Sequence, residues 1–167
     1  MQRGLPMHRY TVVSNATPII LLQNIGQLHL LKALYGAIYI PRAVYDEIAV
    51  KNKLTETDSW INVVDIENKA AKRLLCLNLH NGEAEALLLS TELNADLLLL
   101  DDLAARKYAQ AIGLSISGTL GVLVALKRNG TVDAVKPLLQ MLVANGMYIA
   151  DNLQRNVLDM VGELHGT

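Results

Sequence analysis

The sequence is poor in aromatic residues and in cysteine. It contains no phenylalanine, one tryptophan and one cysteine, and aromatic residues make up 4% of its 167 positions. The single thiol, Cys76, excludes an internal disulfide and a cysteine-based zinc cluster, and it fits a reducing cytoplasm. A core with so few rings must be packed from Leu, Ile, Val and Ala. This favours helices layered on a sheet over an aromatic-rich β-sandwich.

The sequence also lacks a strong net charge and a long apolar run. Its formal net charge is −1, so binding to nucleic acid would have to come from local basic patches. The mean hydropathy is +0.26, but the longest uncharged run, residues 11–31, contains Pro18 and several amides and is too polar to span a bilayer. We expect no membrane association and a cytoplasmic protein, with a flexible lead-in over residues 1–9 and one domain over 10–164.

Strand signals alternate with helix signals along the chain. This alternation predicts an α/β fold, a three-layer α/β/α sandwich with a mainly parallel central sheet. A polar loop is expected over residues 51–59. The predicted strands are 10–14, 37–40, 60–66, 97–100, 115–117 and 147–150, and the predicted helices are 18–25, 27–35, 41–50, 68–77, 83–93, 101 or 102 to 111, 120–128, 132–144 and 151–164.

Four consecutive leucines, residues 97–100, are followed directly by Asp101 and Asp102. Such a run is typical of a strand buried on both faces in a parallel sheet. The acid pair would then lie at the carboxyl end of that strand, where ligands bind in open α/β sheets. Carboxylates gathered there need a cation or a proton to offset their repulsion. The pair therefore indicates a metal-dependent site.

Other polar residues are predicted to lie near the same edge of the sheet: Asn15 after the first strand, Glu47 in the helix after the second, and Glu83 and Glu85 at the start of a later helix. Oxygen ligands of this kind suit Mg²⁺ or Mn²⁺. Glu83 and Glu85 lie about 200° apart around a helix, so only one can point inward. Some of these acids also have a structural explanation. Glu83 would stabilise the start of its helix, and either Asp101 or Asp102 can be an N-cap.

Several blocks of the sequence, in order, resemble the PIN-domain superfamily and are most similar to its DUF3368, VapC-like branch. The blocks are VVSNATPIILLQNIGQLHLL, YGAIYIPRAVYDEI, LHNGEAEALLLSTELNADLLLLDDLAARKYA and GLSISGTLGVLVALKRNG. The resemblance implies Mg²⁺- or Mn²⁺-dependent endoribonuclease chemistry on RNA. It also implies the toxin of a toxin–antitoxin pair, a homodimer and an antitoxin partner.

The resemblance also assigns roles to particular residues. The family's acids fall on Asn15, Glu47, Glu85 or Glu83, and Asp101 or Asp102, while Ser14, Thr17 and Thr119 match hydroxyl positions that line such a site. The departure is Asn15, where the wider superfamily has aspartate. An amide supplies a neutral carbonyl ligand, so we expect weaker cation binding and slower catalysis.

Basic residues near the helix ends are candidates for contact with RNA phosphates. They are Arg42, Arg106, Lys107, Lys127 and Arg128, although cations near a helix end are also stabilising without any ligand. Two other functions stay open. One is a PIN-like scaffold that binds RNA or a protein without cleavage. The other, a phosphoacceptor receiver domain, is disfavoured because its acid pair should follow the first strand, where this chain has Asn15.

Overall fold

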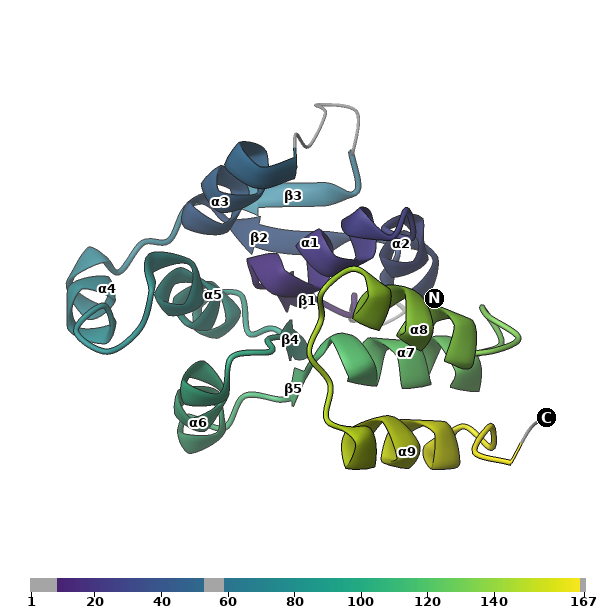
Figure 1. Cartoon of the computed structure of the whole chain (residues 1–167). Helices are drawn as coiled ribbons and strands as arrows, with labels where there is room; N and C mark the ends of the chain where they lie inside the picture. The colour runs from purple at the N-terminus through teal and green to yellow at the C-terminus, as the bar shows by residue number, and fades with distance from the viewer. Residues whose placement is uncertain (1–8, 53–58, 166–167) are drawn as a thin grey trace, which may run out of the picture.

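A five-stranded, all-parallel sheet forms the centre of the computed structural model, which describes residues 9–52 and 59–165 (Figure 1). The strands are β1 (Val12–Ser14), β2 (Ile38–Pro41), β3 (Ile61–Val64), β4 (Leu97–Leu99) and β5 (Ile116–Ser117), in the order β3-β2-β1-β4-β5. From β1 the chain adds β2 and β3 on one side of the sheet, and it then adds β4 and β5 on the other side. The topological switch point therefore lies between β1 and β4.

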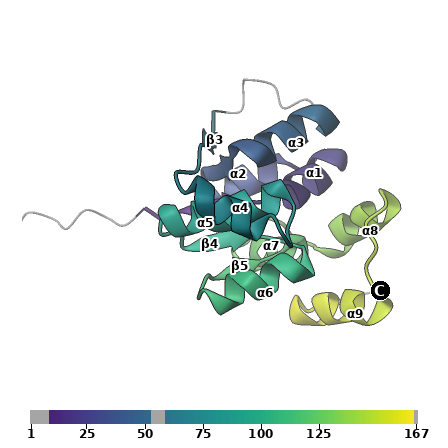
Figure 2. The ribbon, with the colours of Figure 1, turned by 90° about the vertical axis from the view of Figure 1, so that its left-hand side faces the viewer.

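Helices cover both faces of this sheet, so the predicted α/β/α sandwich is confirmed (Figures 1 and 2). The helices on one side, with α3 at the β2–β3 end, are α1 (Ala16–Asn24), α2 (His29–Tyr35), α3 (Arg42–Asn52), α7 (Thr119–Arg128), α8 (Lys136–Ala144) and α9 (Asp151–Met160). Those on the other side are α4 (Lys69–Leu75), α5 (Asn81–Glu92) and α6 (Leu103–Ala111).

Alternate residues of the central strands point into two separate hydrophobic cores. Leu99 belongs to the core beneath α1, α2 and α7, whereas Leu98 and Leu100 belong to the core beneath α5 and α6. All three are at most 1% exposed. The leucine run is therefore uniformly apolar because both sides of the strand are covered, as the sequence predicted.

Most predicted elements are present within a few residues of the predicted bounds, but the strand predicted at 147–150 is wrong. This segment connects α8 to α9 without pairing with the sheet. Ile149 is buried, and its carbonyl accepts a hydrogen bond of 2.8 Å from Gln154 Nε2. The segment is apolar because it anchors the two outer helices against α7, and an apolar anchor resembles a short strand in sequence.

Two further expectations concern segments at the edge of the described chain. Helix α3 continues to Asn52, so the loop predicted from residue 51 begins later. The rest of that loop, residues 53–58, and nearly all of the predicted lead-in, residues 1–8, lie outside the described residues. Among the described residues, no helix has the length and apolarity needed to cross a bilayer.

A carboxylate near the end of the chain joins the outer helices to α7. Glu163 accepts hydrogen bonds of 2.8 Å from the backbone N–H groups of Val135 and Lys136 at the start of α8. It also lies 3.5 Å from Lys127 Nζ on α7. Desolvation raises the pKa of Glu163, but the two N–H donors and the Lys127 charge together lower this pKa below its ordinary value of 4.5.

This lowered pKa predicts a pH-dependent contribution to stability. Because the folded pKa lies below the unfolded one, the contribution is complete above pH 4.5 and is lost as the pH falls through the folded pKa. We expect Glu163→Gln to lower the free energy of unfolding by about 1 kcal/mol at neutral pH. Urea denaturation at a series of pH values measures this, and an equal loss at neutral pH and at low pH would contradict it.

Candidate active site

Asn15 and Asp101 follow the two adjacent strands of the switch point, at the carboxyl edge of the sheet. Asn15 follows β1 directly, and its backbone N–H donates a hydrogen bond of 2.9 Å to the carbonyl of Leu99 in β4. Asp101 comes two residues after Leu99. Adjacent parallel strands end at the same edge, so the two side chains share the crevice in which open α/β sheets bind ligands.

The carboxylate of Asp101 is held at the start of α7. Its Oδ1 accepts a hydrogen bond of 2.8 Å from the Thr119 backbone N–H, and its Oδ2 accepts one of 2.6 Å from Thr119 Oγ1. Gly118 supplies the necessary space, because a Cβ atom there would lie 2.5 Å from Asp101 Oδ1. Each carboxylate oxygen keeps an acceptor site beyond these bonds. Thr119, fully buried, therefore orients Asp101.

Glu47 reaches the same crevice from α3. A Cβ atom added to Gly82 would lie 3.3 Å from Glu47 Oε2 and 3.5 Å from Asn15 Oδ1. These two oxygens thus face one small space above the start of α5, which the glycine leaves open. The other Glu47 oxygen, Oε1, lies 3.1 Å from Lys51 Nζ, one turn further along α3.

Asn15 Oδ1 is buried, and it has no hydrogen-bond partner among the described residues. Such an acceptor is rare and calls for an explanation, for example an ion. A Mg²⁺-type cation fits these residues, since one or two carboxylates, a carbonyl oxygen and waters are its usual ligands. No group of three or more His, Cys, Asp or Glu suited to a metal occurs in the described ranges. With Glu47 and Asp101 as the carboxylates, the third oxygen would come from the Asn15 amide.

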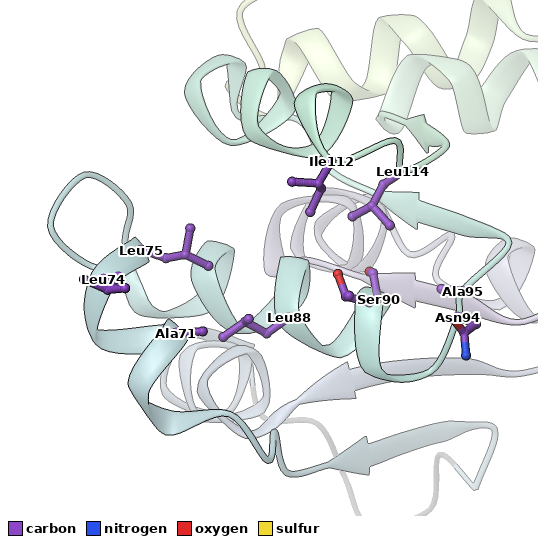
Figure 3. Close-up of a pocket in the computed structure, with 10 residues that line it drawn as sticks. Ala71, Leu74, Leu75, Leu88, Ser90, Asn94, Ala95, Ile112 and Leu114 are labelled. Carbon is purple, nitrogen blue, oxygen red and sulfur yellow. The ribbon is translucent and has the colours of Figure 1, made fainter.

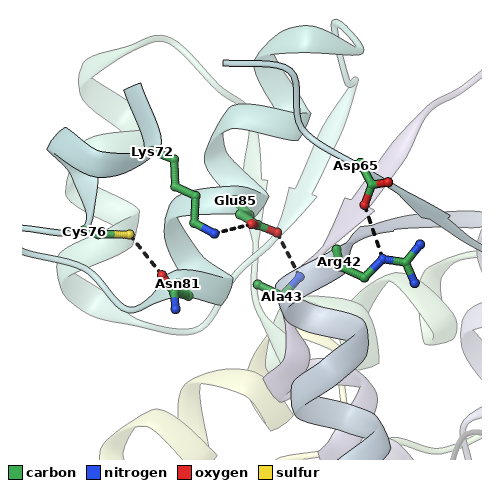
Figure 4. A network of polar contacts seen from close by, with 7 residues as sticks. All are labelled: Arg42, Ala43, Asp65, Lys72, Cys76, Asn81 and Glu85. Atoms are coloured by element: carbon green, nitrogen blue, oxygen red, sulfur yellow. Dashed lines mark hydrogen bonds and ion pairs between the residues drawn. The ribbon is translucent and has the colours of Figure 1, made fainter. Parts of the chain in front are cut away.

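Glu85 is held by an ion pair and a backbone hydrogen bond, one helical turn after Gly82 on α5 (Figure 4). Its Oε1 is 2.6 Å from Lys72 Nζ of α4, and its Oε2 accepts a hydrogen bond of 2.8 Å from the backbone N–H of Ala43 in the first turn of α3. The side chain is 5% exposed. Both oxygens are therefore engaged in joining α3, α4 and α5. Sequence reasoning missed Lys72, whose spacing from Glu85 carries no recognisable signal.

The remaining predicted metal residues also have local hydrogen-bond partners. Glu83 Oε2 accepts a hydrogen bond of 3.0 Å from the His80 backbone N–H at the start of α5. Asp102 is the N-cap of α6, with Oδ1 at 2.8 Å from the Ala105 backbone N–H. Their assignment as metal ligands stays a prediction, and these contacts favour the structural explanations. Asp101 is the member of the pair that faces α7.

The predicted substrate-binding residues fall in different places. Ser14 is buried and donates to the Asn15 carbonyl, while Thr17 is exposed at the start of α1. Arg42 is tied to Asp65 at 3.2 Å on the β3 side of the molecule. Arg106 lies beside the site, with Nη1 donating to the Leu100 carbonyl at 3.1 Å. Of the two arginines, Arg106 is the one adjacent to Asp101.

Two hollows differ in their relation to these carboxylates. One of about 690 Å³ includes Asp101 and Arg106 in its lining. Another of about 650 Å³ lies between α4, α5 and the α6–β5 connection, where Leu75, Leu88, Ile112 and Leu114 surround Ser90 (Figure 3). Its lining has no charged side chain, and Ser90 Oγ donates to the Ala86 carbonyl. Of these two hollows, the first is therefore the one whose lining includes charged side chains.

The Glu85 network predicts a structural effect. Removing one partner of a buried ion pair costs about 3–5 kcal/mol, so Glu85→Ala should lower the free energy of unfolding by roughly this amount. Lys72→Met in the same chain should recover part of the loss. Urea denaturation with and without Mn²⁺ distinguishes a structural role of Glu85 from a role as a metal ligand. Full loss of Mn²⁺-dependent stabilisation in a folded Glu85→Gln variant would instead make Glu85 a ligand.

Comparison with known proteins adds one family. The model of the DUF3368 family, described as a PIN domain, matches residues 11–163, which run from the residue before β1 to a point just after α9. Searches of curated proteins and of solved structures gave no match. The matched region contains Asn15, Glu47, Asp101 and Thr119. Because the match covers nearly the whole chain and agrees with the parallel sheet, the chain belongs to the DUF3368 family of PIN domains.

Proposed function

We propose that the protein is a Mg²⁺- or Mn²⁺-dependent endoribonuclease, with Asn15, Glu47 and Asp101 as its central residues. The buried, unpartnered Asn15 Oδ1 carries this proposal, because it faces the same space as a Glu47 oxygen. The family supports it: PIN domains have a nuclease fold and in general depend on a divalent metal. An RNA substrate is the expectation for a PIN domain.

The chemistry follows from the charges at the crevice. When bound, a divalent cation lowers the pKa of a water molecule and shields the anionic phosphate. Thr119 orients the Asp101 carboxylate through two hydrogen bonds. Arg106 has no ion pair among the described residues, so its guanidinium is available to a phosphate oxygen. Two carboxylates and one neutral amide give a smaller negative charge than an all-acid site.

The biological role that we propose is the toxin of a toxin–antitoxin pair, acting as a homodimer in the cytoplasm. The resemblance to VapC-like proteins supports this role, and an adjacent gene for a small DNA-binding antitoxin would support it further. The alternative is a scaffold that binds RNA or a protein without cleaving it. The neutral Asn15 favours that alternative, since it weakens cation binding.

Loss of either carboxylate should abolish cleavage. We expect Glu47→Gln and Asp101→Asn to reduce Mn²⁺-dependent cleavage of labelled single-stranded RNA by roughly a hundredfold or more, because a charged oxygen is removed from the site. Asp46→Asn and Asp102→Asn are matched controls, since each neutralises a neighbouring exposed acid and asparagine keeps the Asp102 cap. Absence of cleavage by the unaltered chain with any divalent ion, alongside intact RNA binding, would favour the scaffold.

Restoring the acid at position 15 should have the opposite effect. Asn15→Asp adds a charged ligand of nearly the same volume, so we expect Mn²⁺ affinity to rise on the order of tenfold. Isothermal titration calorimetry measures the affinity, and the cleavage assay measures the rate at limiting Mn²⁺. In the metal-free variant, the buried aspartate should have a raised pKa because of desolvation and the nearby carboxylates. An unchanged Mn²⁺ affinity would remove Asn15 from the metal site.

A further inference from the structure

The hollow beside Asp101 has both charged and apolar residues in its lining. Of these, Asp101, Arg106 and Gly118 are part of the candidate active site. The rest of its lining is largely hydrophobic and comes from α6, the β5–α7 region, the α8–α9 connection and α9: Leu103, Ile116, Leu120, Met147, Tyr148, Ile149 and Leu153. Its volume, about 690 Å³, lies within the usual range of ligand pockets.

Large apolar side chains at this hollow are exposed. Tyr148 is 90% exposed, Leu103 77% and Leu153 44%. A single exposed apolar residue needs no explanation, but a group of them beside a polar site indicates a ligand surface. Tyr148 is of special interest because an aromatic ring offers a flat face for stacking.

The backbone holds Tyr148 in this position. Its neighbour Ile149 is 5% exposed and packs in the main core, and the Ile149 carbonyl accepts the hydrogen bond from Gln154 Nε2. The N–H of Met147 donates to the Leu142 carbonyl at the end of α8. The connection is thus anchored on both sides of Tyr148, which limits the loss of conformational entropy when a ligand stacks on the ring.

A nucleotide combines the same two kinds of chemical group as the lining of this hollow. Its phosphate is anionic and suits Arg106 and a cation held beside Asp101, whereas its base is flat and suits the apolar residues. We propose that the hollow receives a nucleobase of single-stranded RNA, next to the phosphate at Asp101, with Tyr148 as the stacking surface. This proposal rests on the proposed nuclease function and names how its substrate is held.

The test measures RNA binding separately from cleavage. The full chain with Glu47→Gln keeps the RNA intact, and the probe is a short single-stranded RNA of mixed sequence with 2-aminopurine at one position, titrated in Mn²⁺. Stacking on aromatic side chains changes affinity substantially, so adding Tyr148→Ala should weaken binding roughly ten- to a hundredfold. Tyr148→Trp should retain binding. In a series of RNAs that carry 2-aminopurine at successive positions, quenching of its fluorescence on binding should be strongest at one position. This quenching should disappear in Tyr148→Ala.

Matched controls come from two other parts of the surface. Tyr108→Ala removes an exposed tyrosine of α6 that does not line the hollow, and Leu74→Ala removes an exposed residue of the hollow in Figure 3. Both should bind RNA as tightly as the parent. Equal affinity of Tyr148→Ala and the parent would overturn the base pocket, even if the Glu47-intact chain cleaves RNA. Tyr148-dependent binding and quenching without any cleavage would support the pocket and refute the nuclease.

Discussion

The parallel pairing of β1 with β4 is the constraint on which the rest of the molecule depends. These strands are adjacent in the sheet although residues 15–96 separate them along the chain, and α5 packs over both. Their pairing creates the switch point and brings Asn15 beside the end of β4. The other site residues, Glu47 and Thr119, lie in helices α3 and α7, which follow β2 and β5 along the chain.

Hydrogen bonds and ion pairs at the edge of the sheet give each of its acids a different partner. Glu85, Glu83 and Asp102 each join or cap helices, through Lys72 and Ala43, His80 and Ala105 respectively. Asp101 is held by Thr119 at the start of α7, Glu47 keeps Oε2 directed at the crevice, and Asn15 adds an unpartnered oxygen. These contacts fix the positions of the side chains before a ligand binds, as a preorganised site requires.

Much of the fold was predictable because periodicity and turn residues act locally. The leucine run, the glycines after α2 and α6, and Asp102 before α6 each carry a local physical signal. The segment 147–150 was not predictable, because its apolar residues pack against helices, and a short apolar run does not say which surface buries it. For the candidate site, residues 15 and 101 were proposed from their positions after strands and residue 47 from its position in the helix after the second strand, whereas the ion pair of Glu85 with Lys72 carried no signal in the sequence.

The sequence by itself determined the class of fold, the two-sided burial of the leucine strand and the presence of acids near the carboxyl ends of strands. It also determined that position 15 carries an amide without charge. Only the tertiary structure decided which partner each acid binds, since a helical repeat gives the relative direction of two side chains but not what lies opposite them. The hollow with Tyr148 likewise depends on the packing of α9, α6 and α7, which no local pattern encodes.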